Sequence, residues 1–588
     1  MQPAISSLLP VPAPFSGWAA KLFALDRVEE AYARLRLSDD GRPFLQRLLE
    51  QLEISCQVAG RDLGHVPRTG PAVLVANHPF GILEGAALAT VLRGIRPDVR
   101  FLANGILGVF PELRDLLLPV NPMGRAERSN AAPLRQAIEF LNGGGLLVVF
   151  PAGEVSHFQW KRREVTDPEW NPAIVRIIAL CARKGVSVPV IPAYVEGSNS
   201  LLFQAAGLLH PRLRTALLAR ELFNKRRQSV DLRIGSPVES GKLLAVEGDG
   251  ARIAYLRWRT YLLGQRCAFK PLSRKPFPAR TSPVGRAALA EPVDSWLLAA
   301  EVESLPLEAR LATSGALTAW IARRGQIPNT LLELGRLREK TFRAVGEGTG
   351  QSRDLDRFDS EYLHLFVWNS ERKELVGAYR LAATDQAPGG LYTASLFRYG
   401  DAFLERLGPA LELGRSFVRE EYQKGFAPLL LLWKGIGKYV AKNPRYRTLF
   451  GPVSISNDYQ ALSRELMVSF LERHAFLRDW AGLVRHRHPF RRRLALPLPE
   501  AGFDAEELSE VISDIEPNGA GIPVLLRQYL KLGGKLLSFN VDPEFSDALD
   551  GLILVDLTCT EPKLLRRYLG AEEAAVFLHY QKGQDGTI

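Results

Sequence analysis

A stretch without regular apolar spacing divides this chain into two halves of different pattern. Residues 269–295 are rich in Pro, Arg and Lys and lack the apolar period that marks helices and strands. The whole chain has 588 residues, whereas a single hydrophobic core stops growing at roughly 250 to 300 residues. We therefore expect two domains, with a linker between them over residues 269–300.

The first half predicts alternating strands and helices. From about residue 60, short apolar runs predict buried strands, and segments with helical apolar spacing lie between and after them. The predicted strands are residues 72–76, 146–150 and 188–195, and the predicted helices are residues 84–92, 212–223 and 253–263. This alternation is typical of an α/β layer.

The second half predicts a different order of elements. Helices are expected first, then a meander of strands, then a long helix entered from a polar, glycine-containing loop. The expected helices are 307–323, 331–342 and one that starts near Phe426, the expected strands are 363–368 and 375–382, and residues 521–557 are expected to hold a further helix and the strand 551–556. This order predicts an α+β domain.

The predicted fold class is therefore α/β plus α+β, in four parts. We expect a helical segment over residues 1–54 that could lie on a membrane surface, an α/β domain over 55–268, the linker 269–300 and an α+β domain over 301–588. No run approaches the roughly 20 apolar residues that a membrane-spanning helix needs. The N-terminus lacks the basic region, apolar core and cleavage site of a signal peptide, so we expect an intracellular protein.

The charge of the chain favours an acidic partner. The formal net charge of +11 suits nucleic acid, anionic lipid or an acidic carrier protein. Basic residues cluster at 161–163, 225–227 and 485–493, and Phe490 makes the last cluster the best candidate for contact with a membrane or a carrier protein. The arginines lack the interleaved aromatic residues of a stacking platform, so we expect no nucleic-acid partner.

The cysteines indicate no metal centre and no disulfide framework. Cys56, Cys181, Cys267 and Cys559 are scattered along the chain without CxxC spacing. Zinc sites and disulfide-rich domains both show closer and more regular cysteine spacing. We therefore expect free thiols.

A histidine and a carboxylate lie at the carboxyl end of a predicted strand. In Asn77-His78-Pro79-Phe80-Gly81-Ile82-Leu83-Glu84, His78 follows the strand 72–76, and Glu84 lies where the next helix is expected to begin. A neutral imidazole can take the proton from an alcohol that attacks a thioester, and a carboxylate on the other ring nitrogen orients the ring. The pair suits acyl transfer to an alcohol. The plain alternative is a histidine that packs beside the helix or caps it.

Two further blocks follow in an order known from one family. Phe150-Pro151-Ala152-Gly153-Glu154-Val155-Ser156 comes after the second strand, and Val188-Pro189-Val190-Ile191-Pro192 lies in the third. Together with Asn77-His78, they make residues 55–240 resemble the glycerolipid acyltransferase superfamily, which includes the bacterial lysophosphatidate acyltransferases. The resemblance implies that His78 is the base, that Glu84 is its carboxylate, and that Asn77, Gly153 and Glu154 bind substrate.

The motifs depart from the usual pattern of that superfamily at two points. The superfamily has His-x4-Asp, whereas here five residues separate His78 from a Glu, and Phe-Pro-Ala-Gly-Glu replaces its Phe-Pro-Glu-Gly. The longer spacing resembles the hemolysin-like branch. Arg125 lies where relatives carry a phosphate-holding arginine. The resemblance implies that Arg125 binds a phosphate or another acid group, and a plain surface arginine is the alternative.

A second candidate site lies at residues 412–427. Glu412-Leu413-Gly414-Arg415-Ser416-Phe417-Val418 predicts a strand, and the polar turn after it leads into an apolar helix. Backbone amides at such a helix start can hold the phosphates of a pantetheine arm, and the strand can offer an amide to the thioester oxygen. We therefore expect the acyl donor to bind at Gln423, Lys424, Gly425 and Ala427. An ordinary turn is the alternative.

Motifs on both sides of this site make residues 325–560 resemble a second family. The motifs are Arg336-Leu337-Arg338-Glu339-Lys340-Thr341-Phe342, Asp356-Arg357-Phe358-Asp359, Gly377-Ala378-Tyr379-Arg380-Leu381, Pro523-Val524-Leu525-Leu526-Arg527-Gln528-Tyr529-Leu530 and Asp542-Pro543-Glu544-Phe545. They are similar to the GNAT-type N-acyltransferases related to acyl-homoserine-lactone synthases and ornithine lipid synthases. The resemblance implies an amino-acid pocket lined by Asp356, Asp359, Arg380, Glu412 and Arg415, with Glu412 as base or water-positioning residue. A surface salt-bridge network is the alternative.

The order of the two modules resembles the bifunctional ornithine lipid synthases. This implies that the C-terminal half transfers a 3-hydroxyacyl group from acyl carrier protein, or from CoA, to the α-amine of ornithine, and that the N-terminal half esterifies the hydroxyl of the product. It implies no permanently bound cofactor and no metal. It also implies a peripheral position on the cytoplasmic face of the inner membrane, with acyl carrier protein and the lipid surface as partners.

Two other functions remain open from the sequence. One is a lysophosphatidate or lysophospholipid acyltransferase of phospholipid synthesis with an accessory GNAT-like domain. The other is a basic, non-catalytic protein of the membrane surface.

Overall fold

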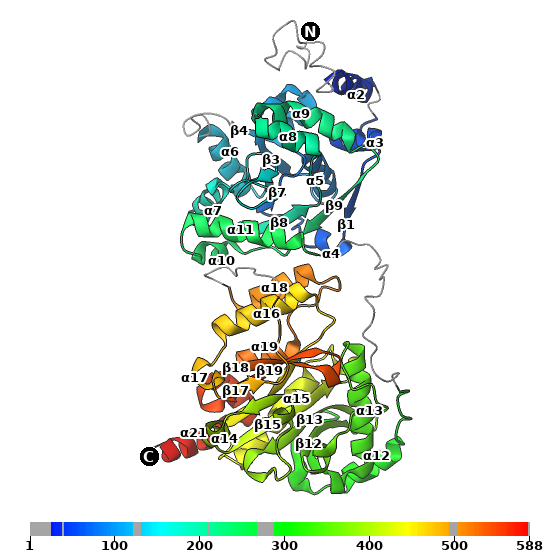
Figure 1. The fold of residues 1–588 in the computed structure, drawn as a ribbon, viewed down its shortest axis with the longest axis vertical. Helices are drawn as coiled ribbons and strands as arrows, with labels where there is room; N and C mark the ends of the chain where they lie inside the picture. The colour runs from blue at the N-terminus through cyan, green and yellow to red at the C-terminus, as the bar shows by residue number, and fades with distance from the viewer. Residues whose placement is uncertain are drawn as a thin grey trace. The chain divides into compact units, whose positions relative to one another are not determined.

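The computed structural model describes residues 25–37, 40–120, 131–209, 211–266, 287–492 and 503–585. Contacts between Cα atoms group the chain into two compact units, each built around its own large sheet (Figure 1). Unit 1 holds the described residues up to 266 together with residues 503–521, and unit 2 holds residues 287–492 and 522–585. The predicted class of α/β plus α+β is confirmed.

Unit 1 has a seven-stranded sheet of order β1-β9-β8-β2-β5-β3-β4. Its strands are β1 (Ser55–Val58), β2 (Ala72–Ala76), β3 (Val99–Asn104), β4 (Leu117–Val120), β5 (Leu146–Val149), β8 (Val190–Val195) and β9 (Ser229–Ile234). Strands β8, β2, β5, β3 and β4 run parallel, while β9 pairs antiparallel with β8. A small hairpin of β6 (His157–Gln159) and β7 (Glu164–Thr166) leaves the sheet after β5.

Helices cover this sheet, so its central strands are buried on both faces. The helices are α2 (Leu25–Leu37), α3 (Phe44–Gln51), α4 (Gly60–Leu63), α5 (Leu83–Arg93), α6 (Ala131–Asn142), α7 (Ala173–Arg183), α8 (Leu201–Leu209), α9 (Pro211–Asn224), α10 (Ser240–Ala245) and α11 (Asp249–Leu263). All five residues of β2 are buried, as expected for a continuous apolar run in a parallel sheet. Small residues of α5, such as Ala87, share a core with Leu74 of β2.

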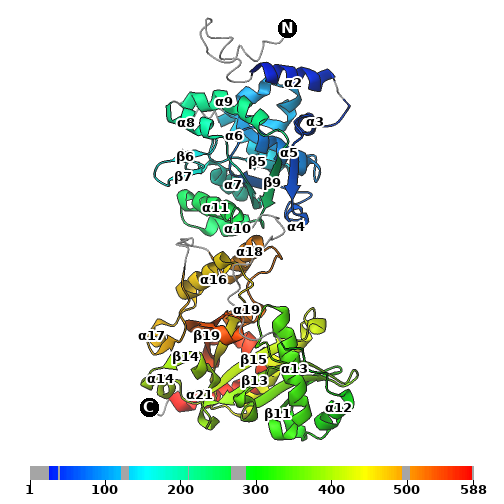
Figure 2. The same ribbon diagram turned by 45° about the vertical axis from the view of Figure 1, so that its right-hand side comes forward.

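One helix of unit 1 comes from far along the chain. Helix α18 (Ala505–Ile515) packs against α11, as Figure 2 shows. Asp514 of α18 accepts hydrogen bonds from Ser236 and pairs with Arg259 at 3.3 Å. The sequence-based division kept 301–588 in one domain, whereas the contacts group residues 503–521 with unit 1.

Unit 2 has an eight-stranded sheet of order β10-β11-β12-β13-β15-β16-β19-β18. Its strands are β10 (Arg310–Ser314), β11 (Leu317–Arg323), β12 (Leu363–Asn369), β13 (Glu374–Ala383), β15 (Ala410–Val418), β16 (Thr448–Ile455), β18 (Lys535–Asp542) and β19 (Ala548–Asp556), and β14 (Phe397–Tyr399) pairs separately with β17 (Val484–His486). All neighbours in the large sheet are antiparallel except β15 and β16.

The helices of unit 2 lie on both faces of this sheet. They are α12 (Ser295–Glu303), α13 (Pro328–Ala344), α14 (Asp401–Leu407), α15 (Ala427–Lys442), α16 (Ala461–His474), α17 (Arg478–Ala481), α19 (Val524–Lys531), α20 (Pro562–Leu569) and α21 (Ala571–Asp585). Helix α13 shares a core with Phe366 and Phe417, while Trp433 of α15 packs edge-on against Tyr379, which points to the other face. The long helix predicted near Phe426 is α15.

Two sequence predictions in this half need correction, and one strand was not predicted. The helix predicted over 307–323 is wrong, because these residues form the β10–β11 hairpin with a left-handed turn at Gly315. Pairing of β11 with β12 along its whole length overrides the helical spacing of the segment. The predicted linker 269–300 already contains the start of α12. The sequence also missed β18, which pairs with the predicted strand at 551–556.

Among the described residues, no helix is both long enough and apolar enough to span a bilayer.

Candidate acyl-transfer sites

In unit 1, the turn between β2 and α5 brings His78 and Glu84 together. His78 Nδ1 lies 2.7 Å from Glu84 Oε1. The turn needs Gly81, whose φ is +100° and whose Cβ, if present, would meet a Leu218 methyl at 2.7 Å. The chain therefore folds back tightly enough for a carboxylate six residues away to reach the imidazole.

The Glu84 carboxylate is fully buried and is held by the backbone. Oε1 accepts hydrogen bonds from the N–H groups of Phe80 (3.0 Å) and Gly81 (2.8 Å). Burial acts to raise the pKa of Glu84, but the His78 ring and the Gly81 amide outweigh it and hold that pKa below its ordinary value. Glu84 is therefore an anion in the folded protein at neutral pH.

This anion makes His78 a stronger base. Burial acts to lower the pKa of His78, but the adjacent Glu84 charge raises it above its ordinary value. The side chain is 15% exposed, and its Nε2 makes no hydrogen bond to any residue that the structure describes. With Nδ1 facing the carboxylate, Nε2 is the atom that can accept a proton from an alcohol.

Residues that the sequence reasoning missed hold His78 in place. Asp167 accepts a hydrogen bond from the His78 N–H at 3.1 Å and another from the Ser156 hydroxyl, and the Ser156 N–H donates to the His78 carbonyl at 2.8 Å. The Phe150 ring stacks on the imidazole with centroids 4.4 Å apart. Asp167 and Trp170, which bond each other at 2.8 Å, carry no recognisable spacing from His78, so only the fold reveals them.

The other residues predicted for the first site lie in varied surroundings. Asn77 is buried, and its side chain exchanges hydrogen bonds of 2.9 and 2.7 Å with the backbone of Val195, so it ties β2 to β8. Gly153 has a left-handed φ of +66° in the turn after β5. Glu154 is exposed and pairs with Arg214 of α9 at 3.2 Å. Arg125 lies outside the described residues.

In unit 2, three arginines and three aspartates form an interleaved network. The pairs are Arg338–Asp359 at 2.7 Å, Arg380–Asp356 at 2.6 Å, Arg380–Asp359 at 3.2 Å, Arg415–Asp354 at 3.0 Å and Arg415–Asp356 at 3.8 Å. The predicted residues Asp356, Asp359, Arg380 and Arg415 are thus brought together. Arg338 and Asp354 complete a set of three positive and three negative groups.

Tyr392 lies between the two central arginines of this network. The guanidinium carbons of Arg380 and Arg415 lie 5.0 and 4.8 Å from its ring centroid, and Arg415 Nη1 donates to its hydroxyl at 2.9 Å. Arg415 itself has a left-handed φ of +48°, next to an irregularity in the pairing of β13 with β15. This strained backbone turns the Arg415 side chain towards the network.

Glu412 has a different setting from the one expected of a base. Its carboxylate is buried and accepts hydrogen bonds from the Tyr362 hydroxyl, the Tyr392 N–H, and the Thr393 N–H and hydroxyl. These donors occupy both oxygens. Glu412 therefore anchors the segment that carries Tyr392, and a proton acceptor for the amine has to be sought elsewhere.

Three further carboxyl groups lie close enough to Arg415 to feel its charge. They are Glu347, Asp542 and Asp550, and each is buried. Asp550 of β19 is opposite Ser454 of β16, whose hydroxyl donates to Glu347 at 3.1 Å. Burial raises the pKa of Glu347 to about 7 and raises the pKa values of Asp542 and Asp550 above their ordinary values. The sequence reasoning assigned none of these carboxyl groups to the pocket.

These carboxyl groups leave unit 2 with an excess of buried acid. The Asp550 carboxylate makes no hydrogen bond or ion pair with any described residue, and Arg415 is already shared among the aspartates of the network. No group of three or more His, Cys, Asp or Glu residues in the described part of the chain is arranged to hold a metal ion. A buried carboxylate without a cation is costly, so this region suits a positively charged group.

The expected donor site lies where two parallel strands separate. Strands β15 and β16 pair only from Ala410 to Glu412, although β15 continues to Val418. Beyond that point the β15 backbone groups on this side pair with no strand that the structure describes. They can offer an amide to a thioester oxygen, as the sequence predicted for this strand.

The start of α15 has the features of an anion site. No side chain in the described part of the chain caps this helix at its N-terminus. Lys424 and Gly425 are exposed just before it, Ala427 is its first residue, and the Gln423 side chain donates to the Val418 carbonyl at 2.8 Å. Free N–H groups and the helix dipole favour a phosphate here.

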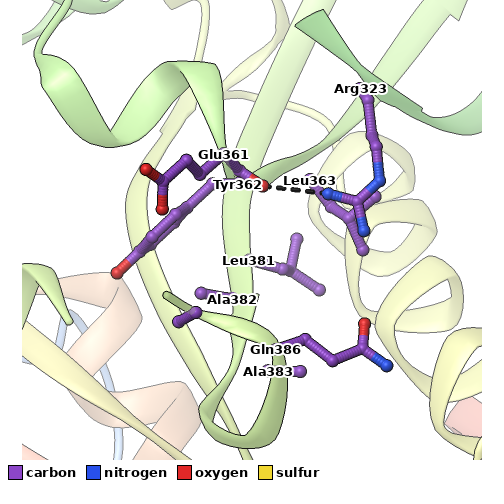
Figure 3. A pocket seen from close by; sticks show the side chains of 9 residues that line it. Arg323, Glu361, Tyr362, Leu363, Leu381, Ala382, Ala383 and Gln386 are labelled. Atoms are coloured by element: carbon purple, nitrogen blue, oxygen red, sulfur yellow. Dashed lines mark hydrogen bonds between the residues drawn. The ribbon is translucent and has the colours of Figure 1, made fainter. Parts of the chain in front are cut away.

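A small pocket lies beside the residues that anchor Glu412 (Figure 3). It is lined by Arg323, Glu361, Tyr362, Leu363, Leu381, Ala382, Ala383, Gln386 and Ala387. Arg323 donates to the Glu361 carbonyl at 3.0 Å across its rim. The pocket contains none of the predicted site residues, and Tyr362 connects it to Glu412.

Comparison with known families finds one match in each half of the chain. Residues 46–268 match the model described as acyltransferase, and residues 337–434 match the model described as acetyltransferase (GNAT) domain. The two matched segments contain His78 with Glu84 and Arg415 with the start of α15, respectively.

Curated relatives and a solved structure are similar to parts of the chain. The glycine N(alpha)-acyltransferase of Bacteroides thetaiotaomicron is 32% identical over 45% of this chain and 85% of its own length. The lyso-glycine lipid O-acyltransferase of Phocaeicola vulgatus is 29% identical over 34% of this chain and 69% of its own length. The crystal structure of the 1-acyl-sn-glycerophosphate acyltransferase PlsC from Thermotoga maritima is 20% identical, over 41% of this chain and 88% of that one, with a TM-score of 0.23.

Proposed function

This acyltransferase belongs to the N-acyltransferase family that includes the Bacteroides thetaiotaomicron protein, and on that premise we propose that it makes an amino-acid lipid in two acyl transfers. Unit 2 forms an amide with the α-amine of ornithine. Unit 1 forms an ester with the hydroxyl of the lipid made in the first step. Acyl carrier protein or CoA supplies both acyl groups as thioesters.

In the first transfer, the amine nitrogen attacks the thioester carbonyl of a 3-hydroxyacyl donor. The C–N bond forms, the C–S bond breaks, and the thiol leaves with a proton. The open edge of β15 stabilises the carbonyl oxygen, and the start of α15 holds the phosphate of the pantetheine arm. Glu347, with a pKa near 7, has the strength to take the proton that the ammonium group loses near neutral pH.

In the second transfer, the 3-hydroxyl group of the N-acylated amino acid attacks another thioester. His78 Nε2 takes the hydroxyl proton as the C–O bond forms, and Glu84 stabilises the imidazolium. The proton then passes to the leaving thiolate. Asp167 and Ser156 keep the imidazole fixed during both proton transfers.

The observation that carries this proposal is the 2.7 Å contact between His78 and Glu84, with Nε2 left available, in a chain that also contains the arginine–aspartate network. The first supplies a base for an alcohol. The second supplies charged groups for an amino acid.

Ornithine is favoured over glycine by the charge of unit 2. Ornithine brings two ammonium groups and one carboxylate, whereas glycine brings one of each. The network of three arginines and three aspartates is balanced, and Glu347, Asp542 and Asp550 add buried carboxyl groups whose pKa values are raised. A second ammonium group would favour the ionised form of such a carboxyl group and pair with it.

Lipid mass spectrometry of a heterologous host tests the two steps. We expect the intact chain to yield a diacylated ornithine lipid, and His78→Ala to accumulate only the mono-acylated form. Detection of a glycine lipid in place of the ornithine lipid would change the proposed amino acid and leave the two-step scheme in place. Purified protein that esterifies lysophosphatidate and leaves the mono-acylated amino acid untouched would make it a phospholipid acyltransferase.

A further inference from the structure

The β6–β7 hairpin of unit 1 (residues 157–166) ends in an exposed aromatic and cationic tip. Its strands pair from His157–Thr166 to Gln159–Glu164, and the tip is Trp160-Lys161-Arg162-Arg163. Arg162 and Arg163 donate their N–H groups to the Gln159 carbonyl, and Arg163 has a left-handed φ of +56°. The tip is therefore a tight, hydrogen-bonded turn.

Trp160 is unusually exposed for a tryptophan. Its side chain is 72% exposed and touches Phe158, two residues earlier on the same face of the hairpin, with ring centroids 5.1 Å apart. Val165, opposite Phe158, is also exposed. Large apolar side chains are normally buried, so an exposed group of this kind marks a contact surface.

The three cations beside Trp160 have no acidic partners. Lys161, Arg162 and Arg163 are exposed, and none forms an ion pair with a residue that the structure describes. Glu154, nearby in sequence, is already paired with Arg214. The tip thus carries three positive charges around an aromatic side chain, with Glu164 directly after them, so residues 160–164 have a net charge of +2.

The base of the hairpin is the group of residues that holds His78. The hairpin begins directly after Ser156 and ends directly before Asp167, and both residues bond the backbone of His78. Its first strand is also fixed to α8, because Gln204 accepts the Phe158 N–H at 3.0 Å. At about 3.3 Å per residue, Trp160 lies roughly 13 Å along the chain from Ser156.

We propose that this hairpin docks unit 1 on an anionic lipid surface, with Trp160 inserted at the headgroup level and Lys161, Arg162 and Arg163 bound to lipid phosphates. Tryptophan prefers the interface between hydrocarbon and water, and clustered Lys and Arg bind anionic headgroups. An acidic carrier protein would satisfy the cations, but it gives no reason for the exposed Trp160. Because the hairpin grows from the residues that hold His78, docking would bring the membrane surface next to the proposed base.

Flotation of the purified full-length protein with vesicles tests this proposal. The vesicles are phosphatidylcholine with and without phosphatidylglycerol. We expect the wild type to bind the anionic vesicles, and K161Q/R162Q/R163Q to lower the partition coefficient roughly a hundredfold, at about fivefold per cation. Trp160→Ala is expected to weaken binding severalfold at unchanged charge. Vesicles with brominated phosphatidylglycerol are expected to quench the tryptophan fluorescence of the wild type more than that of Trp160→Phe.

Two matched controls use other parts of the chain. R68Q/R183Q/K184Q removes the same charge from exposed, unpaired sites in unit 1, and Trp296→Ala removes an equally exposed tryptophan from unit 2. Binding that falls equally with the controls would overturn the proposal. Hairpin variants that bind the vesicles as strongly as the wild type would also overturn the proposal. If such variants lost acyl transfer from acyl carrier protein, the hairpin would be a contact for the carrier protein instead.

Discussion

At the scale of single residues, the charge of Glu84 is what raises the pKa of His78. The carboxylate lies against Nδ1 and is itself held by the Phe80 and Gly81 amides. A glutamine at position 84 can keep the amide hydrogen bonds through its carbonyl oxygen. It cannot stabilise an imidazolium by charge.

We therefore predict that Glu84→Gln lowers the rate of ester formation by roughly 10²- to 10⁴-fold and leaves amide formation unchanged. Wild-type activity should fall as the pH drops through the raised pKa of His78, because the base must be neutral. In Glu84→Gln that acid limb should move to lower pH. The pH dependence of kcat/KM with a lyso-lipid acceptor measures both effects. If the pH at which the activity falls were the same in Glu84→Gln and wild type, Glu84 would not be the partner of His78 in catalysis.

The raised pKa of Glu347 leads to a prediction about how the stability of the folded protein depends on pH. Its pKa of about 7 in the folded protein exceeds the ordinary carboxyl value, so folding opposes its ionisation. The wild type should lose stability as the pH rises from the ordinary pKa of a glutamate carboxyl group to about 7. Glu347→Gln should be equally stable below that window and more stable above it, by roughly 1 to 3 kcal/mol.

Thermal unfolding midpoints at several pH values measure this difference. Glu371→Gln, at an exposed position of unit 2, is the matched control and should show no pH-dependent gain. Saturation with ornithine should reduce the difference in unfolding midpoint between Glu347→Gln and wild type, since a bound ammonium group compensates the carboxylate. A constant gap at all pH values would show that Glu347 is not the titrating group.

At the scale of elements, the Asp514 carboxylate is one of the groups that fasten helix α18 to unit 1. Asp514 accepts from the Ser236 N–H and hydroxyl, and it pairs with Arg259, which is itself buried. Removing one partner of a buried ion pair leaves the other without compensation, at a cost of about 3 to 5 kcal/mol.

We predict that Asp514→Ala lowers the temperature at which ester formation is lost and leaves the temperature for loss of amide formation unchanged. Heating samples and assaying both reactions separately gives the two values. Asp504→Ala, which removes only the N-terminal cap of the same helix, should have a smaller effect of about 1 kcal/mol. Equal effects of the two variants would mean that Asp514 is not the fastening residue.

At the scale of the whole molecule, unit 1 is completed by residues encoded late in the second half. Leu508, Val511, Ile512 and Ile515 of α18 are almost fully buried. A chain cut after residue 268 lacks this helix and exposes the surface that it covers. We predict that residues 1–268 alone are aggregation-prone and lack O-acylation activity.

Joining residues 503–521 to residue 268 through a flexible linker should restore soluble, active protein. The comparison of the two shortened chains by size-exclusion chromatography and by ester formation is the measurement. Soluble, fully active residues 1–268 would contradict the role given to α18.

Local patterns of the sequence predict much of the architecture. The apolar run 72–76, the helix after Glu84 and the strand–turn–helix around Arg415 and Gly425 were predicted from spacing alone, and the structure confirms these elements. Their periodicity is a property of neighbouring residues, so it is readable without the fold. The resemblance of each half to an acyltransferase family came from the same short motifs.

Tertiary structure alone decided the surroundings of Glu412 and Asp550. The sequence placed Glu412 in the pocket, yet four donors from two other segments enclose its carboxylate. The Asp550 carboxylate, which no motif indicated, has no partner among the described residues. In the same way, the helical spacing of residues 307–323 yielded to pairing with β12. The environment of a side chain depends on residues that are distant in the chain, and local spacing carries no record of them.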